Sequence, residues 1–181
     1  VNEDIVSPID FAATFLEIAG ASVPRDLDGA SLVPVLKGKT PRNWRKTHYY
    51  HYYEYPGWHL VRRHYGVVDG RYKLIHNLRG GKIPALHSVD GDSALQQSFH
   101  LPEKHPARLA IERAVNPPEF ELYDLGEDPV EFFNLAGKPD ATQIEAKLKQ
   151  ALKTWQLKTG DPFMDPRFRV AVEKKYKQVA K

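Results

Sequence analysis

The sequence contains no cysteine, no long apolar run and no strong excess of charge of one sign. Without cysteine, its 181 residues form no disulfide, no thiolate metal site and no cysteine nucleophile. No apolar stretch approaches the ~20 residues that span a bilayer, so we expect no membrane partner. The net charge is only +3, whereas nucleic-acid-binding proteins usually carry a strongly basic face, so we expect no nucleic-acid partner. The content of 41% hydrophobic and 27% charged residues is typical of a folded globular protein.

The start of the sequence has strong helix signals. Ser7 suits the N-cap, Pro8 suits the first helical position, and Asp10 follows three residues after the cap. Gly20 suits the C-terminal end. Apolar residues occupy most sides of this predicted helix, residues 8–19, so it needs cover on most sides. We expect it to be mobile, or to drive self-association, where that cover is missing.

The middle of the sequence is expected to form strands after a connecting loop at 21–42. The expected strands are rich in β-branched and aromatic residues and comprise residues 46–55, 60–68, 71–76 and 119–125. The pair Asp69-Gly70 separates two of them and is typical of a type I′ hairpin turn. Residues 78–118 contain five prolines and one helical stretch, at 106–115. We interpret them as a long insertion.

Helical spacing returns after Asp140. Apolar residues recur on one face and predict a helix that ends at Gly160 and packs on a sheet; they are Ile144, Leu148, Ala151, Leu152 and Trp155. A second helical spacing follows at 167–181. The pattern as a whole predicts an α+β fold, with a small antiparallel β-sheet packed by a long C-terminal helix.

Three stretches resemble motifs of one enzyme family, in that family's order. Residues 121–136 read ELYDLGEDPVEFFNLA, and residues 6–20 read VSPIDFAATFLEIAG, followed by DGASL at 28–32. Between them, residues 65–77 include YGV and RYKLIHN. These stretches resemble the C-terminal portion of formylglycine-dependent, or type I, sulfatases. The chain's last segments and its long insertion are most similar to the heparan N-sulfatase (sulfamidase) branch.

The sequence after the fourth expected strand has a simple physical interpretation. Leu122 and Leu125 should pack the strand against a core, and Asp124 and Asp128 should accept backbone N–H groups in the turn. Pro129 fixes the backbone φ angle that the turn needs. A turn of this kind occurs in many folds, so the order of the three motifs carries the resemblance.

The resemblance implies a domain organisation. Residues 1–43 would be the last helix and loop of an alkaline-phosphatase-like α/β catalytic domain, and residues 44–165 the sulfatase C-terminal subdomain, with its insertion at about 78–118. Residues 166–181 would be a helical tail. The chain starts VNED, which is neither a signal peptide nor a natural start, so we expect it to be a piece of a longer protein. The family resemblance suggests a periplasmic, secreted or lysosomal location.

The resemblance also implies a chemistry. In type I sulfatases a cysteine is oxidised to formylglycine, which attacks sulfur while a calcium ion neutralises the sulfate charge. No position in this chain matches those catalytic or metal-binding motifs, so we assign it no catalytic residue, no metal ligand and no cofactor of its own. We expect it to hydrolyse nothing by itself. The partner implied for the full-length protein is a sulfated glycan of the heparan sulfate type.

Histidine and tyrosine are concentrated in 48–76, which permits three interpretations. A metal site is the weakest, because no pair has helical i, i+4 spacing with a ligand motif, and a half-exposed sheet surface is the simplest. The third is substrate contact, because Pro56-Gly57 interrupts the strand pattern and suits a loop. Aromatic, imidazole and carboxylate groups suit a sugar, and arginine suits sulfate. The predicted substrate-binding residues are Glu54, Trp58, His59, Arg62, Arg63 and His64.

Two functions therefore compete. The first is a fragment of a hydrolase acting on sulfate esters or sulfamates of glycans, which completes the fold and supplies residues to the substrate cleft. The alternative is a self-standing binding module for sulfated polysaccharide, with Trp58, His59, Arg62 and Arg63 as its face. A stable monomer with micromolar glycan affinity would favour the module, and an exposed apolar first helix would oppose it.

Overall fold

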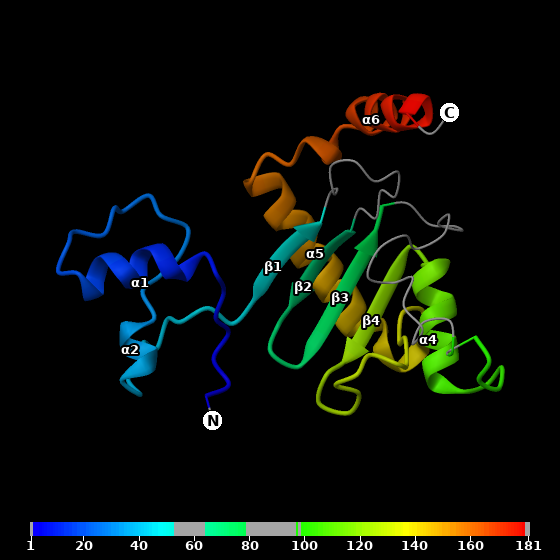
Figure 1. Ribbon diagram of the computed structural model, residues 1–181, viewed down its shortest axis with the longest axis horizontal. Helices are drawn as coiled ribbons and strands as arrows, with labels where there is room; N and C mark the ends of the chain where they lie inside the picture. The colour runs from blue at the N-terminus through cyan, green and yellow to red at the C-terminus, as the bar shows by residue number, and fades with distance from the viewer. Residues whose placement is uncertain (1, 53–63, 79–96, 98, 180–181) are drawn as a thin grey trace. The chain divides into compact units, whose positions relative to one another are not determined.

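The computed structural model describes residues 2–52, 64–78, 97 and 99–179 (Figure 1). The chain divides into two compact units, Val1–His48 and Tyr49–Lys181. The domain boundaries predicted at 43/44 and 165/166 stay predictions.

The first unit contains α1 (Asp10–Ile18) and the short α2 (Val33–Leu36). The predicted helix is confirmed, and the short α2 lies in the loop that follows it. The predicted Ser7 side-chain cap is wrong: the N-cap residue is Ile9, without a side-chain cap. Instead, the backbone N–H of Ser7 donates to the Asp10 carboxylate at 2.9 Å. At the other end, Gly20 adopts φ +70°, the left-handed conformation that commonly ends a helix.

Asp10 and Thr14 hold the loop after α1 against the helix. The fully buried Asp10 carboxylate accepts the N–H of Ala30 at 2.9 Å and is also paired with Arg45. The Thr14 hydroxyl donates to the Asp10 carbonyl at 2.7 Å and accepts the N–H of Leu32 at 2.9 Å. These bonds satisfy buried polar groups at both ends. They hold residues 30–32 against α1.

The second unit is built on a four-stranded sheet in the order β1-β2-β3-β4. The strands are β1 (His48–Tyr52), β2 (His64–Val68), β3 (Tyr72–Asn77) and β4 (Phe120–Asp124). The β2–β3 and β3–β4 pairs are antiparallel. All four predicted strands are present, and the parts of the first two within 53–63 lie outside the described residues.

The β2–β3 hairpin is confirmed, but its predicted turn geometry is wrong. A type I′ turn needs positive φ at two consecutive residues. Gly70 has φ +83°, whereas Asp69 is not among the residues with positive φ. The Asp69 N–H donates to the Tyr72 carbonyl at 3.0 Å. The two central residues are therefore Gly70 and Arg71, and the turn lies one residue later than the Asp-Gly pair suggests.

One face of the sheet packs on α5 (Thr142–Lys158) (Figure 1). The predicted apolar stripe of this helix meets the sheet, and the buried core comprises Tyr65, Val67, Leu74, Leu122, Ala141, Leu148, Leu152 and Phe163. The short turns η2 (Pro139–Ala141) and η3 (Pro162–Met164) flank α5. This antiparallel sheet with a long helix on one face confirms the predicted α+β class.

The described part of the second unit contains two further helices. The helix α4 (Pro106–Val115) is the one expected within the insertion, and α6 (Pro166–Val179) is the expected C-terminal helix. The predicted turn after β4 is also confirmed, since Asp124 accepts the N–H of Gly126 at 3.1 Å and Asp128 accepts that of Phe133 at 2.7 Å. Within the described part of the chain, no helix has the length and apolar character needed to cross a membrane.

Candidate functional site

The face of the sheet opposite α5 carries a cluster of polar side chains. Successive residues of a strand point to opposite faces, so the burial of Leu74 and Leu122 against α5 directs their neighbours to the other side. We call this surface the polar face. It comprises Tyr50, Lys73, Asn77, Glu121 and Tyr123 from the strands, joined by Arg113 from α4 and Glu131 from the turn after β4.

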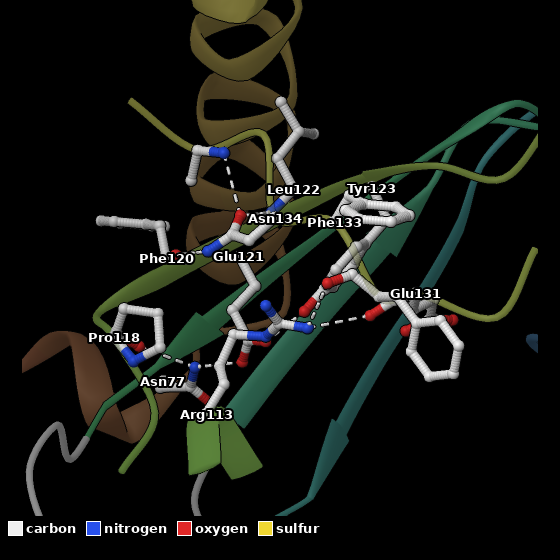
Figure 2. Close-up of polar contacts among 12 residues, drawn as sticks. Asn77, Arg113, Pro118, Phe120, Glu121, Leu122, Tyr123, Glu131, Phe133 and Asn134 are labelled. Atoms are coloured by element: carbon white, nitrogen blue, oxygen red, sulfur yellow. Dashed lines mark hydrogen bonds and ion pairs between the residues drawn. The ribbon is translucent and has the colours of Figure 1, made fainter. Parts of the chain in front are cut away.

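Glu121 is the centre of the polar face (Figure 2). Its carboxylate accepts the Asn77 side-chain amide at 2.8 Å and the Tyr123 hydroxyl, and it pairs with Arg113 Nε at 3.3 Å. The Glu121 and Arg113 side chains are only 13% and 16% exposed. The pair is therefore partly desolvated, and an ion pair of that kind interacts more strongly than one in open water.

A second ion pair lies beside the first. Lys73 Nζ lies 2.7 and 2.8 Å from the two carboxylate oxygens of Glu131, a residue with the unusual backbone φ of +59°. The Tyr50 ring lies across Gly66, where a side chain would overlap it. Burial, and then the negative charge of Glu131, raises the pKa of Tyr50. Its phenol therefore stays protonated at neutral pH and is not a base or a nucleophile.

Tyr123 is a second phenol of the polar face with a raised pKa. Burial and its hydrogen bond to Glu121 raise the pKa of this phenol, so it remains a donor to the carboxylate. Both carboxylates of the polar face have cationic partners. Its geometry therefore suits holding β3, β4, α4 and the turn after β4 together rather than proton transfer.

One end of the sheet carries His64 and His76, two histidines of the cluster noted in the sequence. At this end β1 finishes with Tyr52, β2 starts with His64, β3 finishes with Asn77 and β4 starts with Phe120. His64 is the register partner of Asn77. The His76 ring stacks on Phe120, with ring centres 4.4 Å apart and planes 14° apart. Burial lowers the pKa of His76, and its Nε2 lies 3.8 Å from Glu119.

Most of the predicted substrate-binding residues fall outside what the structure describes. These are Glu54, Trp58, His59, Arg62 and Arg63. The sixth, His64, is the first residue of β2 and has a place in the sheet register. The structure thus locates the point where the predicted substrate segment rejoins the sheet, and the contacts of the segment itself stay predictions.

Asn77, Arg113 and Glu121 were not among the site residues predicted from the sequence. The alternation of β4 offered a signal for Glu121, since a charged residue next to the apolar Leu122 belongs on the opposite face. Nothing in the sequence pairs Arg113 with it, because their contact depends on how α4 meets the sheet. Among the residues that the structure describes, no group of three or more His, Asp or Glu side chains is arranged to hold a metal ion.

Comparison with known proteins gives consistent matches. The family model described as N-sulphoglucosamine sulphohydrolase, C-terminal matches residues 1–107. An N-acetylglucosamine-6-O-sulfatase of Bacteroides thetaiotaomicron is 39% identical over 158 residues, which cover 85% of this chain and 22% of that protein. An ulvan-active sulfatase of Formosa agariphila is 29% identical over 164 residues, covering 88% of this chain and 30% of that protein.

A solved structure is also similar to this chain. A protein crystallised in complex with its substrate D-glucosamine-2-N,6-O-disulfate superposes with a TM-score of 0.57 and 37% identity. The match covers 84% of this chain and 24% of that chain. The chain thus spans between 22% and 30% of the length of these relatives.

Proposed function

The chain belongs to the family of N-sulphoglucosamine sulphohydrolase C-terminal domains, and we propose that it completes a longer sulfatase that removes sulfate from glucosamine units of glycans. Its α+β fold is that of the sulfatase C-terminal subdomain. The description of the matched family names N-sulphoglucosamine, and the B. thetaiotaomicron relative is an N-acetylglucosamine-6-O-sulfatase. The substrate of the solved relative is a sulfated glucosamine as well. Glucosamine is common to all three descriptions, and this is the observation on which the proposed substrate class rests.

The descriptions differ in which sulfate they name. The family description contains an N-sulfate, the relative is a 6-O-sulfatase, and the substrate in the solved complex carries both groups. The proposed substrate is therefore glucosamine carrying an N-sulfate, a 6-O-sulfate or both. A heparan-type glycan contains this unit, in line with the sulfamidase-like branch expected from the sequence.

The catalytic groups of type I sulfatases do not fit this chain. It has no cysteine to become formylglycine, and its described residues contain no cluster of metal-ligand type. No chemical step is therefore assigned to its residues. Its proposed contributions are completion of the fold and binding of substrate, and alone it should release no sulfate.

The apolar face of α1 supports the completion role. Phe11, Phe15 and Ile18 lie on one side of the helix, at positions i, i+4 and i+7, and are each between 50% and 66% exposed. Burying a large apolar side chain contributes about 1.5–3 kcal/mol, so three such residues on one side of a short helix favour a covering partner. We assign that cover to the rest of the sulfatase catalytic domain. In the isolated chain the same face should cause self-association.

The proposed substrate contacts are those of the segment from Glu54 to His64, where Trp58 would stack on a sugar face. His59 and Glu54 would bond its hydroxyls, while Arg62, Arg63 and His64 would meet anionic groups. Arginine is suited to sulfate because its planar group donates two parallel hydrogen bonds. The location of His64 at the start of β2 supports this proposal, since residues at a strand end and in the adjoining loop can project into a cleft.

A kinetic comparison tests the proposal in the longer sulfatase that this chain would complete. Arg63→Ala should raise KM for D-glucosamine-2-N,6-O-disulfate about tenfold, the effect of losing one charged hydrogen bond of ~1.5 kcal/mol. It should leave turnover of 4-nitrophenyl sulfate nearly unchanged, because that small ester would not reach Arg63.

Arg71→Ala is the matched control. Arg71 lies in the β2–β3 turn, at the opposite end of the sheet from His64, and pairs with Asp124 at 2.5 Å. Arg71→Ala should change neither KM for D-glucosamine-2-N,6-O-disulfate nor the turnover of 4-nitrophenyl sulfate by more than about twofold. Equal damage to both substrates by Arg63→Ala would refute the binding assignment. Micromolar glycan affinity in a monomeric isolated chain would favour the binding module instead.

A further inference from the structure

Asn77 connects the two ends of the long segment that separates β3 from β4. It is the last residue of β3 and is 9% exposed. Its side-chain amide donates to the Pro118 carbonyl at 2.8 Å and to Glu121 at 2.8 Å, and its backbone N–H donates to the Glu119 carbonyl at 2.8 Å. Asn77 therefore extends the β3–β4 pairing that closes this connection of about 40 residues, whose closure is opposed by chain entropy.

Arg113 fastens the helix of that segment to the same point. Besides its ion pair with Glu121, its guanidinium donates to the carbonyls of Glu131 at 3.0 Å and Phe132 at 2.9 Å (Figure 2). None of the α4 residues whose burial the structure describes belongs to the buried core. The attachment of α4 to the sheet therefore depends strongly on Arg113.

The connection continues to the candidate substrate residue His64. Arg113 contacts Glu121, Glu121 accepts from Asn77, and Asn77 is the register partner of His64 across the β2–β3 pair. Each step is a direct contact or a strand pairing between described residues. Movement of Arg113 or Glu121 would thus be transmitted to the backbone where β2 begins.

We propose that Arg113, Glu121 and Asn77 form a positioning relay that fixes the end of the sheet at which His64 lies. The three are positioning residues, because they act on substrate through the strand ends. The effect of the relay on substrate binding rests on the function proposed above. Its effect on the strand ends does not, so the two can be tested separately.

The first test uses the chain itself and hydrogen exchange. Arg113→Met retains most of the side-chain length and removes the charge and donors. Arg113→Met should speed hydrogen exchange of the Asn77 backbone N–H, and of the backbone N–H groups at the start of β2, roughly tenfold. Arg113→Lys keeps the charge but not the fork of donors, so it should give an intermediate effect.

Arg108→Met is the matched control on the same helix. Arg108 pairs with Glu112 at 2.8 Å and donates to the Leu101 carbonyl at 2.9 Å, and neither partner belongs to the sheet. This variant should leave exchange at the strand ends unchanged. If Arg113→Met does not fold, Glu121→Gln replaces it, since it retains an acceptor for Asn77 and removes the charge that attracts Arg113.

The second test measures kinetics in the longer sulfatase. Arg113→Met should raise KM for D-glucosamine-2-N,6-O-disulfate roughly threefold to tenfold and leave kcat for 4-nitrophenyl sulfate unchanged. Unchanged exchange at Asn77 and β2 in a folded Arg113 or Glu121 variant would overturn the relay. Faster exchange without turnover by the unmutated sulfatase would support the relay and refute the proposed function.

Discussion

Gly29→Ala is expected to open the loop after α1, for reasons of space alone. The φ angle of Gly29 is not in the left-handed region, so its backbone conformation suits alanine. A Cβ at this position, however, would overlap the Ile9 carbonyl oxygen, come within 2.5 Å of its carbonyl carbon and lie 3.0 Å from Asp10 Cα. All three atoms belong to the backbone, so no side-chain rotation relieves the overlap. The loop has to move.

The size of the effect follows from the hydrogen bonds beside Gly29. Carbon atoms pack at about 3.5 Å or more, so the loop must retreat by about 1 Å. The bonds from Ala30 to Asp10 and from Leu32 to Thr14, each 2.9 Å, would then exceed ordinary hydrogen-bond distances. A bond to a charged group contributes about 1.5–3 kcal/mol and a neutral one about 0.5–1.5 kcal/mol. Reduced entropy of the unfolded chain offsets about 0.4–1 kcal/mol, which leaves a net loss of about 1–4 kcal/mol.

Amide hydrogen exchange at Ala30 and Leu32 measures this loss locally. A change of about 2 kcal/mol corresponds to exchange roughly 30-fold faster. Gly126→Ala is the control, because there the nearest atom to a Cβ is the side-chain oxygen of Asp124, at 3.3 Å. It should leave these two amides unchanged. If Gly29→Ala also left them unchanged, the contact between loop and helix would not have the geometry described here.

Two further predictions concern the second unit. Because burial lowers the pKa of His76 below its ordinary value of 6.5, the unfolded chain binds the proton more readily. This contribution to stability is present above about pH 6.5 and is lost as pH falls toward the folded pKa. His76→Phe keeps the ring stack and removes the titrating group. The free energy of unfolding, measured with urea, should therefore fall less between about pH 7.5 and about pH 5 than it does in the unmutated chain. An equal fall in both proteins would show that His76 does not cause the pH dependence. Asn134→Ala should lower the free energy of unfolding by about 1–3 kcal/mol, since its amide oxygen accepts the N–H groups of Leu122 and Ala136, both at 2.9 Å. The same change at the exposed Asn116 should cost under about 0.5 kcal/mol, and equal losses would refute this role.

Local sequence patterns predicted the elements of the fold well. The α5 stripe, the β2–β3 hairpin and the helix within the insertion each depend on residues close in sequence, where periodicity and turn chemistry are informative. The turn of the hairpin was misplaced by one residue. An Asp-Gly pair permits more than one turn, and the register is set by packing of the whole sheet on α5.

The polar face was much less predictable. Its main ion pair joins Arg113 to Glu121 across an intervening connection, and the other joins Lys73 to Glu131, 58 positions away. Such contacts depend on how α4 and the turn after β4 meet the sheet, which no local pattern specifies. The left-handed backbone of Glu131 was equally hidden, because nonglycine residues rarely adopt it. The predicted substrate segment remains a prediction from residue chemistry.

If this chain completes a sulfatase, sulfate release should require both this chain and the rest of that protein. The measurement compares D-glucosamine-2-N,6-O-disulfate hydrolysis by the upstream part of that sulfatase with and without this chain, and by the chain alone. We predict sulfate release only when both parts are present. Phe15→Glu should strongly reduce it, because a charge on the exposed face of α1 would prevent apolar packing. Sulfate release by the chain alone, or full activity of the upstream part without it, would refute the completing role of this chain.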